Sequence, residues 1–174
     1  MNTKRKWFHW GMTVTALLIA FISVVWSRSS SRPAHGGLPD GSWIVSILPT
    51  SGPPGTELPP LFYALITMTN EGSLVQSDIM PPGLPQTATP AHGEWTPISY
   101  NQFALTYFKL LSNGKGRFQG ILKIREIITL DITGTKYSGQ GQIEVLNEDG
   151  DVTASFEIIT QASLIRVEQF KSQL

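Results

Sequence analysis

The 174-residue sequence contains no cysteine, and charged residues make up only 15% of it. Without cysteine, the chain cannot form a disulfide bond, a thiolate zinc site or a cysteine nucleophile. Its 13 basic residues are balanced by 13 acidic ones, which is a poor composition for binding nucleic acid. The hydrophobic fraction of 41% is too high for a generally disordered chain. The length suits one domain of roughly 100–150 residues and an additional segment.

Basic residues are distributed unevenly along the chain. No lysine or arginine occurs between Arg32 and Lys109, a stretch that contains five acidic residues. From residue 33 onward there are 8 basic and 13 acidic residues, which gives a net charge of −5. The main part of the chain is therefore mildly acidic, and the basic residues near the N-terminus make the total neutral.

Residues 1–27 have the layout of a signal peptide or a single-pass membrane anchor. A basic start precedes an uncharged apolar stretch, and the 20 residues from Trp7 to Trp26 would span about 30 Å as a helix, enough to cross a bilayer. Tryptophans stand at both ends of this stretch, as they do at membrane interfaces. The sequence therefore predicts an N-terminal hydrophobic helix, either cleaved or retained with the N-terminus inside, then a Ser/Pro/Gly linker over residues 28–40. The domain over residues 41–170 would be extracytoplasmic, either secreted or anchored to a membrane.

From Gly41 onward, apolar residues alternate or run in short stretches between turn residues, which is typical of β-strands. Short connections rich in Gly, Asn and Asp favour tight antiparallel turns. An antiparallel meander leaves two unpaired edges, and closure into a barrel removes them. We therefore predict an all-β fold, an eight-stranded antiparallel up-and-down β-barrel. The expected strands are Ser42–Leu48, Leu61–Thr69, Ser73–Ile79, Gly93–Pro97, Gln102–Leu111, Arg117–Asp131, Lys136–Leu146 and Val152–Glu168.

All 12 prolines lie between residues 33 and 97, and most of them fall in two long connections, Pro49–Pro60 and Met80–His92. Proline cannot donate to a central ladder, so both connections are expected to be loops. In a meander, successive loops alternate between the two ends. Both proline-rich connections should therefore lie at one end and form a mouth, while short turns close the other end.

Alternation along the strands predicts which side chains face the barrel interior. An eight-stranded barrel is wide enough either to be filled by its own side chains or to hold one small ligand. Phe118 and Tyr137 are expected to face inward, and Gly139 and Gly141 would relieve crowding on the inner face. The candidate ligand-lining residues are Phe103, Leu105, Tyr107, Leu122, Ile124, Glu126, Ile143 and Phe156.

Gly41-Ser42-Trp43 at the start of the first strand, together with Arg166 near the C-terminus, resembles the pattern of the calycins, the superfamily of lipocalins, fatty-acid-binding proteins and avidins. The resemblance covers about residues 40–168. It implies that Gly41, Trp43 and Arg166 close the bottom of the barrel, with Arg166 packed across the indole ring, a contact worth about 1–2 kcal/mol when desolvated.

The sequence also departs from this pattern. A T-D-Y-type motif, a C-terminal helix, a disulfide and a helix-turn-helix lid are all missing from it. This would be an outlying lipocalin-like barrel, and allene-oxide-cyclase-type barrels are about equally similar. The resemblance supplies no ligand-binding residues.

Glu126 is the only acid on the apolar face of its strand. It could orient a ligand head group or act as a base, because desolvation raises the pKa of a carboxyl group. It could also sit at a bulge, at the rim or beside a polar neighbour. Tyr107 and Tyr137 could point hydroxyl groups into a cavity or simply belong to the core.

Other chemistry finds little support. Beyond the leader, His35 and His92 are the only histidines, and both are expected in loops, so we predict no metal site and no cofactor. No serine stands in a nucleophile-elbow context, and no Gly-rich phosphate loop occurs between a strand and a helix. The basic residues are expected on a solvated outer face: Lys109, Lys115, Arg117, Lys123 and Arg125.

Three functions remain open. The first is a binding module for a small hydrophobic molecule of the lipid, terpenoid or pigment class. The second is a filled, ligand-free barrel that acts as an interaction or accessory domain through its proline-rich loops. The third is a cyclase- or isomerase-type enzyme in which Glu126 or a tyrosine moves a proton. Residues 7–26 would contact a membrane if the leader is retained, and the sequence identifies no protein partner.

Overall fold

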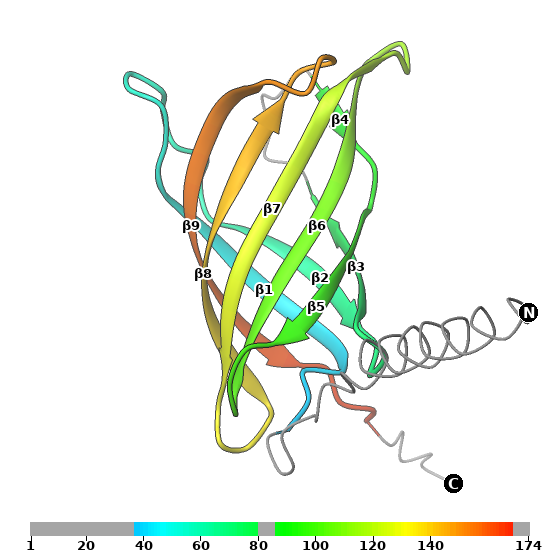
Figure 1. Ribbon diagram of the computed structural model, residues 1–174, viewed down its shortest axis with the longest axis vertical. Coiled ribbons are helices and arrows are strands. Elements are labelled where there is room, and N and C mark those ends of the chain that lie inside the picture. The colour runs from blue at the N-terminus through cyan, green and yellow to red at the C-terminus, as the bar shows by residue number, and fades with distance from the viewer. Residues whose placement is uncertain (1–36, 80–85, 169–174) are drawn as a thin grey trace, which may run out of the picture. The chain divides into compact units, whose positions relative to one another are not determined.

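The computed structural model describes residues 37–79 and 86–168, and within these ranges the chain forms one closed antiparallel β-barrel (Figure 1). The predicted leader and most of the predicted linker lie outside the described residues. Within the described ranges, no helix has the length and apolar character needed to cross a membrane.

The described part of the chain contains nine strands, paired in the order β4-β6-β5-β3-β2-β1-β9-β8-β7. Pairing of β6 with β7 closes the sheet into a barrel. Every pair is antiparallel, and all barrel strands that follow one another along the chain are neighbours, as expected for an up-and-down barrel. The strands are β1 (Gly41–Ser51), β2 (Phe62–Met68), β3 (Ser73–Asp78), β4 (Gln86–Ala88), β5 (Ala91–Pro97), β6 (Gln102–Asn113), β7 (Phe118–Leu130), β8 (Lys136–Leu146) and β9 (Val152–Leu164).

Strands β4 and β5 are two pieces of one barrel strand, because both pair with the same edge of β6. The break falls at Pro90, which has no N–H to donate to the ladder. Thr89 bridges it: its N–H donates to the carbonyl of Leu110 at 3.0 Å, and its hydroxyl accepts from the Leu110 N–H at 3.1 Å. The barrel therefore has eight strands around its circumference, as the sequence predicts.

Several details of the predicted strands are wrong. β1 continues through Pro49 to Ser51, so the first proline-rich connection is not a loop throughout. His92 lies in β5 rather than in a loop, and β9 ends at Leu164 rather than at Glu168. The connection Met80–His92 is not a loop throughout, because the proline-free residues of β4 continue the ladder along β6. Phe118 does not face inward: a shift of register opposite Leu111 and Ser112 reverses the alternation, and the Phe118 side chain is 41% exposed.

The two ends of the barrel differ in their connections (Figure 1). The proline-rich end carries the β1–β2 loop, the end of β3, the start of β4, and the β6–β7 and β8–β9 turns. The closed end carries the short β2–β3, β5–β6 and β7–β8 turns. The strand ends that flank both proline-rich connections thus lie at one end, as the sequence predicts.

Aromatic side chains fill the barrel next to the closed end. The Trp43 ring is fully buried and lies 5.1 Å from the Tyr137 ring, while Trp95 packs edge-on against Phe103 at 5.4 Å. Each indole N–H donates to a main-chain carbonyl, that of Trp43 to Pro39 at 2.8 Å and that of Trp95 to Thr69 at 2.9 Å. Buried aromatic side chains of this size each remove on the order of 200 Å² of surface from water. They therefore stabilise the packing at the closed end of the barrel.

Candidate functional site

The barrel interior holds a cavity of about 340 Å³ on the side of the proline-rich end. Its walls come from β6, β7, β8 and β9 and also from the second half of β1, the β1–β2 loop, the start of β2 and the end of β3, which place it toward this end. Of the sixteen described residues that line it, thirteen are apolar or aromatic and three are polar. The lining residues are Ile47, Pro49, Pro59, Phe62, Gln76, Asp78, Tyr107, Lys109, Leu111, Leu122, Ile124, Ile143, Val145, Ala154, Phe156 and Ile158.

The structure brings five of the eight candidate ligand-lining residues to this cavity. They are Tyr107, Leu122, Ile124, Ile143 and Phe156. Phe103, Leu105 and Glu126 are buried as well, but they do not line it. These three belong to the packed half of the barrel, so the interior is filled near the closed end and hollow near the proline-rich end.

Lys109 lies inside the barrel, and its expected place on a solvated outer face is wrong. Its side chain is only 2% exposed and lines the cavity. The signal that could have identified it is strand alternation, because Lys109 follows Leu105 and Tyr107 on the inward face of β6. Gln76 and Asp78, on the inward face of β3, were also missed as candidate residues.

These three side chains form the polar cluster of the cavity, defined here as Gln76, Asp78 and Lys109. The Lys109 ammonium group makes an ion pair with Oδ1 of Asp78. The amide Nε2 of Gln76 donates to Oδ2 of the same carboxylate at 3.1 Å. The amide oxygen of Gln76 is buried, and it has no hydrogen-bond partner among the described residues. The cluster therefore places hydrogen-bond donors and a hydrogen-bond acceptor on an otherwise apolar wall.

Glu126 lies on the closed-end side of the cavity, in a second polar group that contains Tyr107 and Thr160. The Thr160 hydroxyl donates to Oε1 of Glu126, and the Tyr107 hydroxyl donates to Oε2 at 3.5 Å. Burial raises the pKa of the Glu126 carboxyl group to about 7, although both hydrogen bonds act in the opposite direction. Because Tyr107 also lines the cavity, it connects the cavity to this carboxyl group.

Burial also raises the pKa of the Tyr107 and Tyr137 hydroxyl groups above the ordinary value, and the nearby charge of Glu126 adds to the effect in both. Both phenols therefore remain protonated and available as donors at neutral pH. The Tyr137 hydroxyl is buried and has no hydrogen-bond partner among the described residues.

Of the three residues expected to close the barrel, Gly41 and Trp43 lie in β1, whereas Arg166 lies outside the strands. Gly41 opens β1 with a φ of 124°, which favours glycine, and Trp43 is fully buried. Arg166 follows the end of β9 and is exposed, and the ring that contacts Trp43 is that of Tyr137. The main chain nevertheless joins the two ends of the domain, because Ile165 N–H donates to the carbonyl of Ser42 at 2.8 Å.

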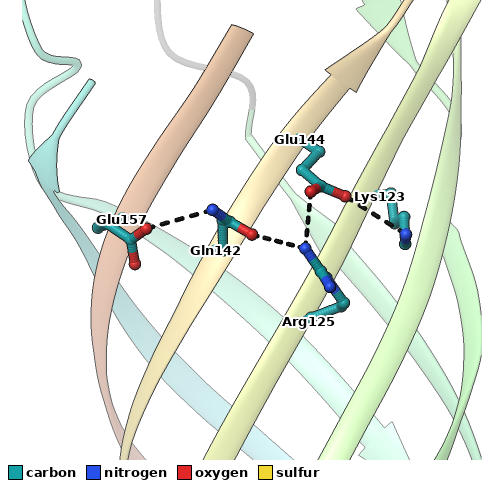
Figure 2. A network of polar contacts seen from close by, with 5 residues as sticks. All are labelled: Lys123, Arg125, Gln142, Glu144 and Glu157. Carbon is teal, nitrogen blue, oxygen red and sulfur yellow. Dashed lines mark hydrogen bonds and ion pairs between the residues drawn. The ribbon is translucent and has the colours of Figure 1, made fainter. Parts of the chain in front are cut away.

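The outer wall over β7, β8 and β9 carries a polar network rather than a basic patch (Figure 2). Glu144 pairs with Arg125 at 2.6 Å and with Lys123 at 3.3 Å. Arg125 also donates to Gln142 at 2.6 Å, and Gln142 donates to Glu157 at 3.3 Å. Acidic groups therefore neutralise this part of the basic stretch.

No group of three or more His, Asp or Glu side chains within residues 37–79 and 86–168 is arranged to hold a metal ion. No protein-family model matches the chain, and a search of curated proteins gives no match. The functional inference therefore rests on the cavity and the side chains that line it.

Proposed function

We propose that this chain is an extracytoplasmic binding module for one small hydrophobic molecule of the lipid, terpenoid or pigment class. The observation that carries the proposal is the cavity of about 340 Å³, since small-molecule sites typically enclose about 300–1,000 Å³. Its mainly apolar lining would supply affinity by burying ligand surface, worth about 25 cal/mol per Å². The three polar residues would supply orientation and selectivity.

The proposal includes membership of the calycin superfamily as an outlying lipocalin-like barrel. Its support is the closed eight-stranded barrel together with the placement of Gly41 and Trp43, the two residues of the G-x-W pattern, at the start of β1. Support for an extracytoplasmic location comes from the sequence alone, through the basic and apolar layout of residues 1–27.

The proline-rich end is the proposed route of entry. Pro49 near the end of β1, Pro59 in the β1–β2 loop and Phe62 at the start of β2 all line the cavity. Movement of a surface loop disturbs fewer packed side chains than opening of the closed end would, where Trp43 and Trp95 are buried.

Native mass spectrometry of the full chain, purified from its own host without detergent, tests the proposal. We expect extra mass that disappears on extraction with organic solvent and that identifies the ligand. A mass equal to that of the chain alone would contradict the proposal and favour the ligand-free accessory domain.

A matched pair of variants tests whether the cavity holds that mass. Ala154→Phe places a large side chain in the cavity and should abolish binding. Ser155→Phe adds the same group on the outer face of the same strand and should leave binding unchanged. Retention of the ligand by the Ala154→Phe variant would place it elsewhere.

An enzyme of the cyclase or isomerase type is the second candidate, favoured by one observation. Tyr107 contacts both the cavity and Glu126, whose carboxyl pKa near 7 suits proton transfer at neutral pH. Once a bound molecule is identified, its turnover by the Glu126→Gln variant tests whether Glu126 is the acid or base. Unchanged turnover would exclude Glu126 as the acid or base.

A further inference from the structure

The Gln76 side chain has one unsatisfied group, and the chemistry of its neighbour fixes which group that is. A carboxylate has no proton to donate, so the amide N–H₂ must face Asp78 and the amide oxygen must face away. This oxygen is buried within a side chain that is 2% exposed, and Gln76 lines the cavity. A buried acceptor without a donor is costly, so the site is complete only when a donor arrives from the cavity.

Lys109 presents the complementary need. Its ammonium group carries three donors, and its one described partner is the Asp78 carboxylate, with which it makes an ion pair but no regular hydrogen bond. Gln76 and Lys109 contact different oxygens of that carboxylate. The unsatisfied acceptor and the unsatisfied donors therefore belong to two side chains that contact the same carboxylate and line the same cavity.

A hydroxyl group is the smallest group that meets both needs, because it donates one hydrogen bond and accepts others. Placed at this cluster, it would donate to the amide oxygen of Gln76 and accept from Lys109. An alkane supplies neither interaction, and a carboxylate supplies only the acceptor.

The charge of the cluster favours an uncharged ligand. Asp78 and Lys109 cancel each other, and among the described residues they are the only charged ones in the lining. A carboxylate ligand would bring an additional negative charge next to Asp78 in an apolar enclosure, where an unpaired charge is strongly disfavoured. An ammonium ligand would meet Lys109 with the same result.

We infer that the cavity selects an uncharged apolar molecule with a hydroxyl group, such as a fatty or terpenoid alcohol, and that Gln76 and Lys109 bind this hydroxyl. The inference rests on the proposed function and specifies its ligand class. Gln76 and Lys109 would thus determine specificity, while the apolar walls would accept many hydrocarbon shapes.

The test compares three probes of equal chain length, n-decanol, n-decanoate and n-decane, titrated against the full chain in native mass spectrometry. We expect n-decanol to bind at least about tenfold more tightly than n-decanoate. The Gln76→Leu variant should weaken n-decanol binding by about tenfold while changing n-decane binding by less than about twofold. Ser77→Ala, on the outward face of the same strand, is the matched control and should change neither.

The possible failures are distinguishable. If none of the three probes binds, the proposed function and the inference both fall. If n-decane and n-decanol bind but Gln76→Leu weakens them equally, a water molecule or the protein already satisfies the cluster, and only the inference falls. Tighter binding of n-decanoate than of n-decanol also overturns the inference alone. Gln76→Met serves as a second variant, and the comparison of n-decanol with n-decanoate on the unaltered chain needs no variant at all.

Discussion

The hydroxyl group of Thr160 on β9 donates a hydrogen bond to the carboxyl oxygen of Glu126 on β7, although β8 separates the two strands in the sheet. Gly139 of β8 lies between them and makes the contact possible, because a Cβ there would stand 2.3 Å from Glu126 Oε1 and 2.4 Å from Thr160 Oγ1. The glycine thus leaves room for a polar contact rather than for a bend alone.

Gly139→Ala should therefore destabilise the barrel, by about 2 kcal/mol or more, because the added methyl group must displace the buried pair. Urea unfolding measures the change. Gly114→Ala is the matched control, since a Cβ at Gly114 would meet nothing within 4 Å. Equal midpoints for the two variants would contradict the assigned role of Gly139.

Glu126 should make stability depend on pH in an unusual direction for an acid. Its pKa is about 7 in the folded barrel and 4.5 without the shift, so the folded state holds an additional proton between these values. The contribution of this group to the free energy of unfolding is therefore greatest below about pH 4.5. It falls as pH rises to 7, by on the order of 3 kcal/mol.

Urea unfolding at a series of pH values, compared between the unaltered chain and Glu126→Gln, isolates this contribution. The unfolding free energy of the unaltered chain minus that of Glu126→Gln should fall as pH rises from about 4.5 to 7 and then level off. A difference that stays constant over this range would show that the carboxyl pKa is not raised.

The sequence predicts most of the barrel because its strands are local patterns. Alternation places Trp43, Tyr107 and Ile124 inside, and the prolines indicate the two long connections, although β1 and β5 extend into them. The errors have identifiable causes. Gln86–Ala88 is too short to show a period, and the register shift that turns Phe118 outward depends on the partner strand β6.

The candidate site was predictable only in part, because a cavity depends on contacts across the barrel. Alternation alone could have placed Lys109 inside, but nothing local indicates that its charge meets Asp78 of β3. Nor does alternation separate the filled half, with Phe103 and Leu105, from the hollow half. That division depends on how the side-chain volumes of all eight barrel strands add up.

Asp131 organises the β7–β8 turn. Its carboxylate accepts from the N–H groups of Thr135 at 2.9 Å and Lys136 at 3.1 Å, and from the Thr133 hydroxyl at 2.7 Å. Asp131→Ala should therefore lower the urea midpoint. Asp149→Ala is the control at the opposite end, because no hydrogen bond of the Asp149 carboxylate occurs in the described part of the chain, and it should have little effect. Similar losses in the two variants would exclude a special role for Asp131.

The hydrogen bond from Thr133 and those from the main chain lower the pKa of Asp131. Its contribution to stability is therefore present above the ordinary pKa of an aspartate and is lost as pH falls through the lowered value. This is opposite in sign to Glu126, so the loss caused by Asp131→Ala should shrink in acid. A loss that stays constant with pH would show that the carboxylate charge does not matter for the turn.

The outer network should contribute little despite its short distances. Arg125 is 47% exposed beside Glu144, and exposed pairs are worth at most about 1 kcal/mol because water screens them. Glu144→Gln should lower the unfolding free energy by less than about 1 kcal/mol, and the loss should shrink further in high salt. Thermal unfolding at low and high salt checks this, and a large loss that salt does not change would indicate a structural role for Glu144 that its charge does not explain.

The ion pair inside the cavity should behave in the opposite way, because both partners are removed from water. Asp78→Asn leaves the Lys109 ammonium buried without its counter-ion and should cost about 3–5 kcal/mol. Lys109→Met should cost less, since Asp78 keeps its hydrogen bond from Gln76. The double variant Asp78→Asn/Lys109→Met leaves no charge in the cavity wall, so it should be more stable than the sum of the single losses by about 1–3 kcal/mol. Urea unfolding of all four proteins measures this coupling, and strictly additive losses would mean that the two groups do not interact in the folded barrel.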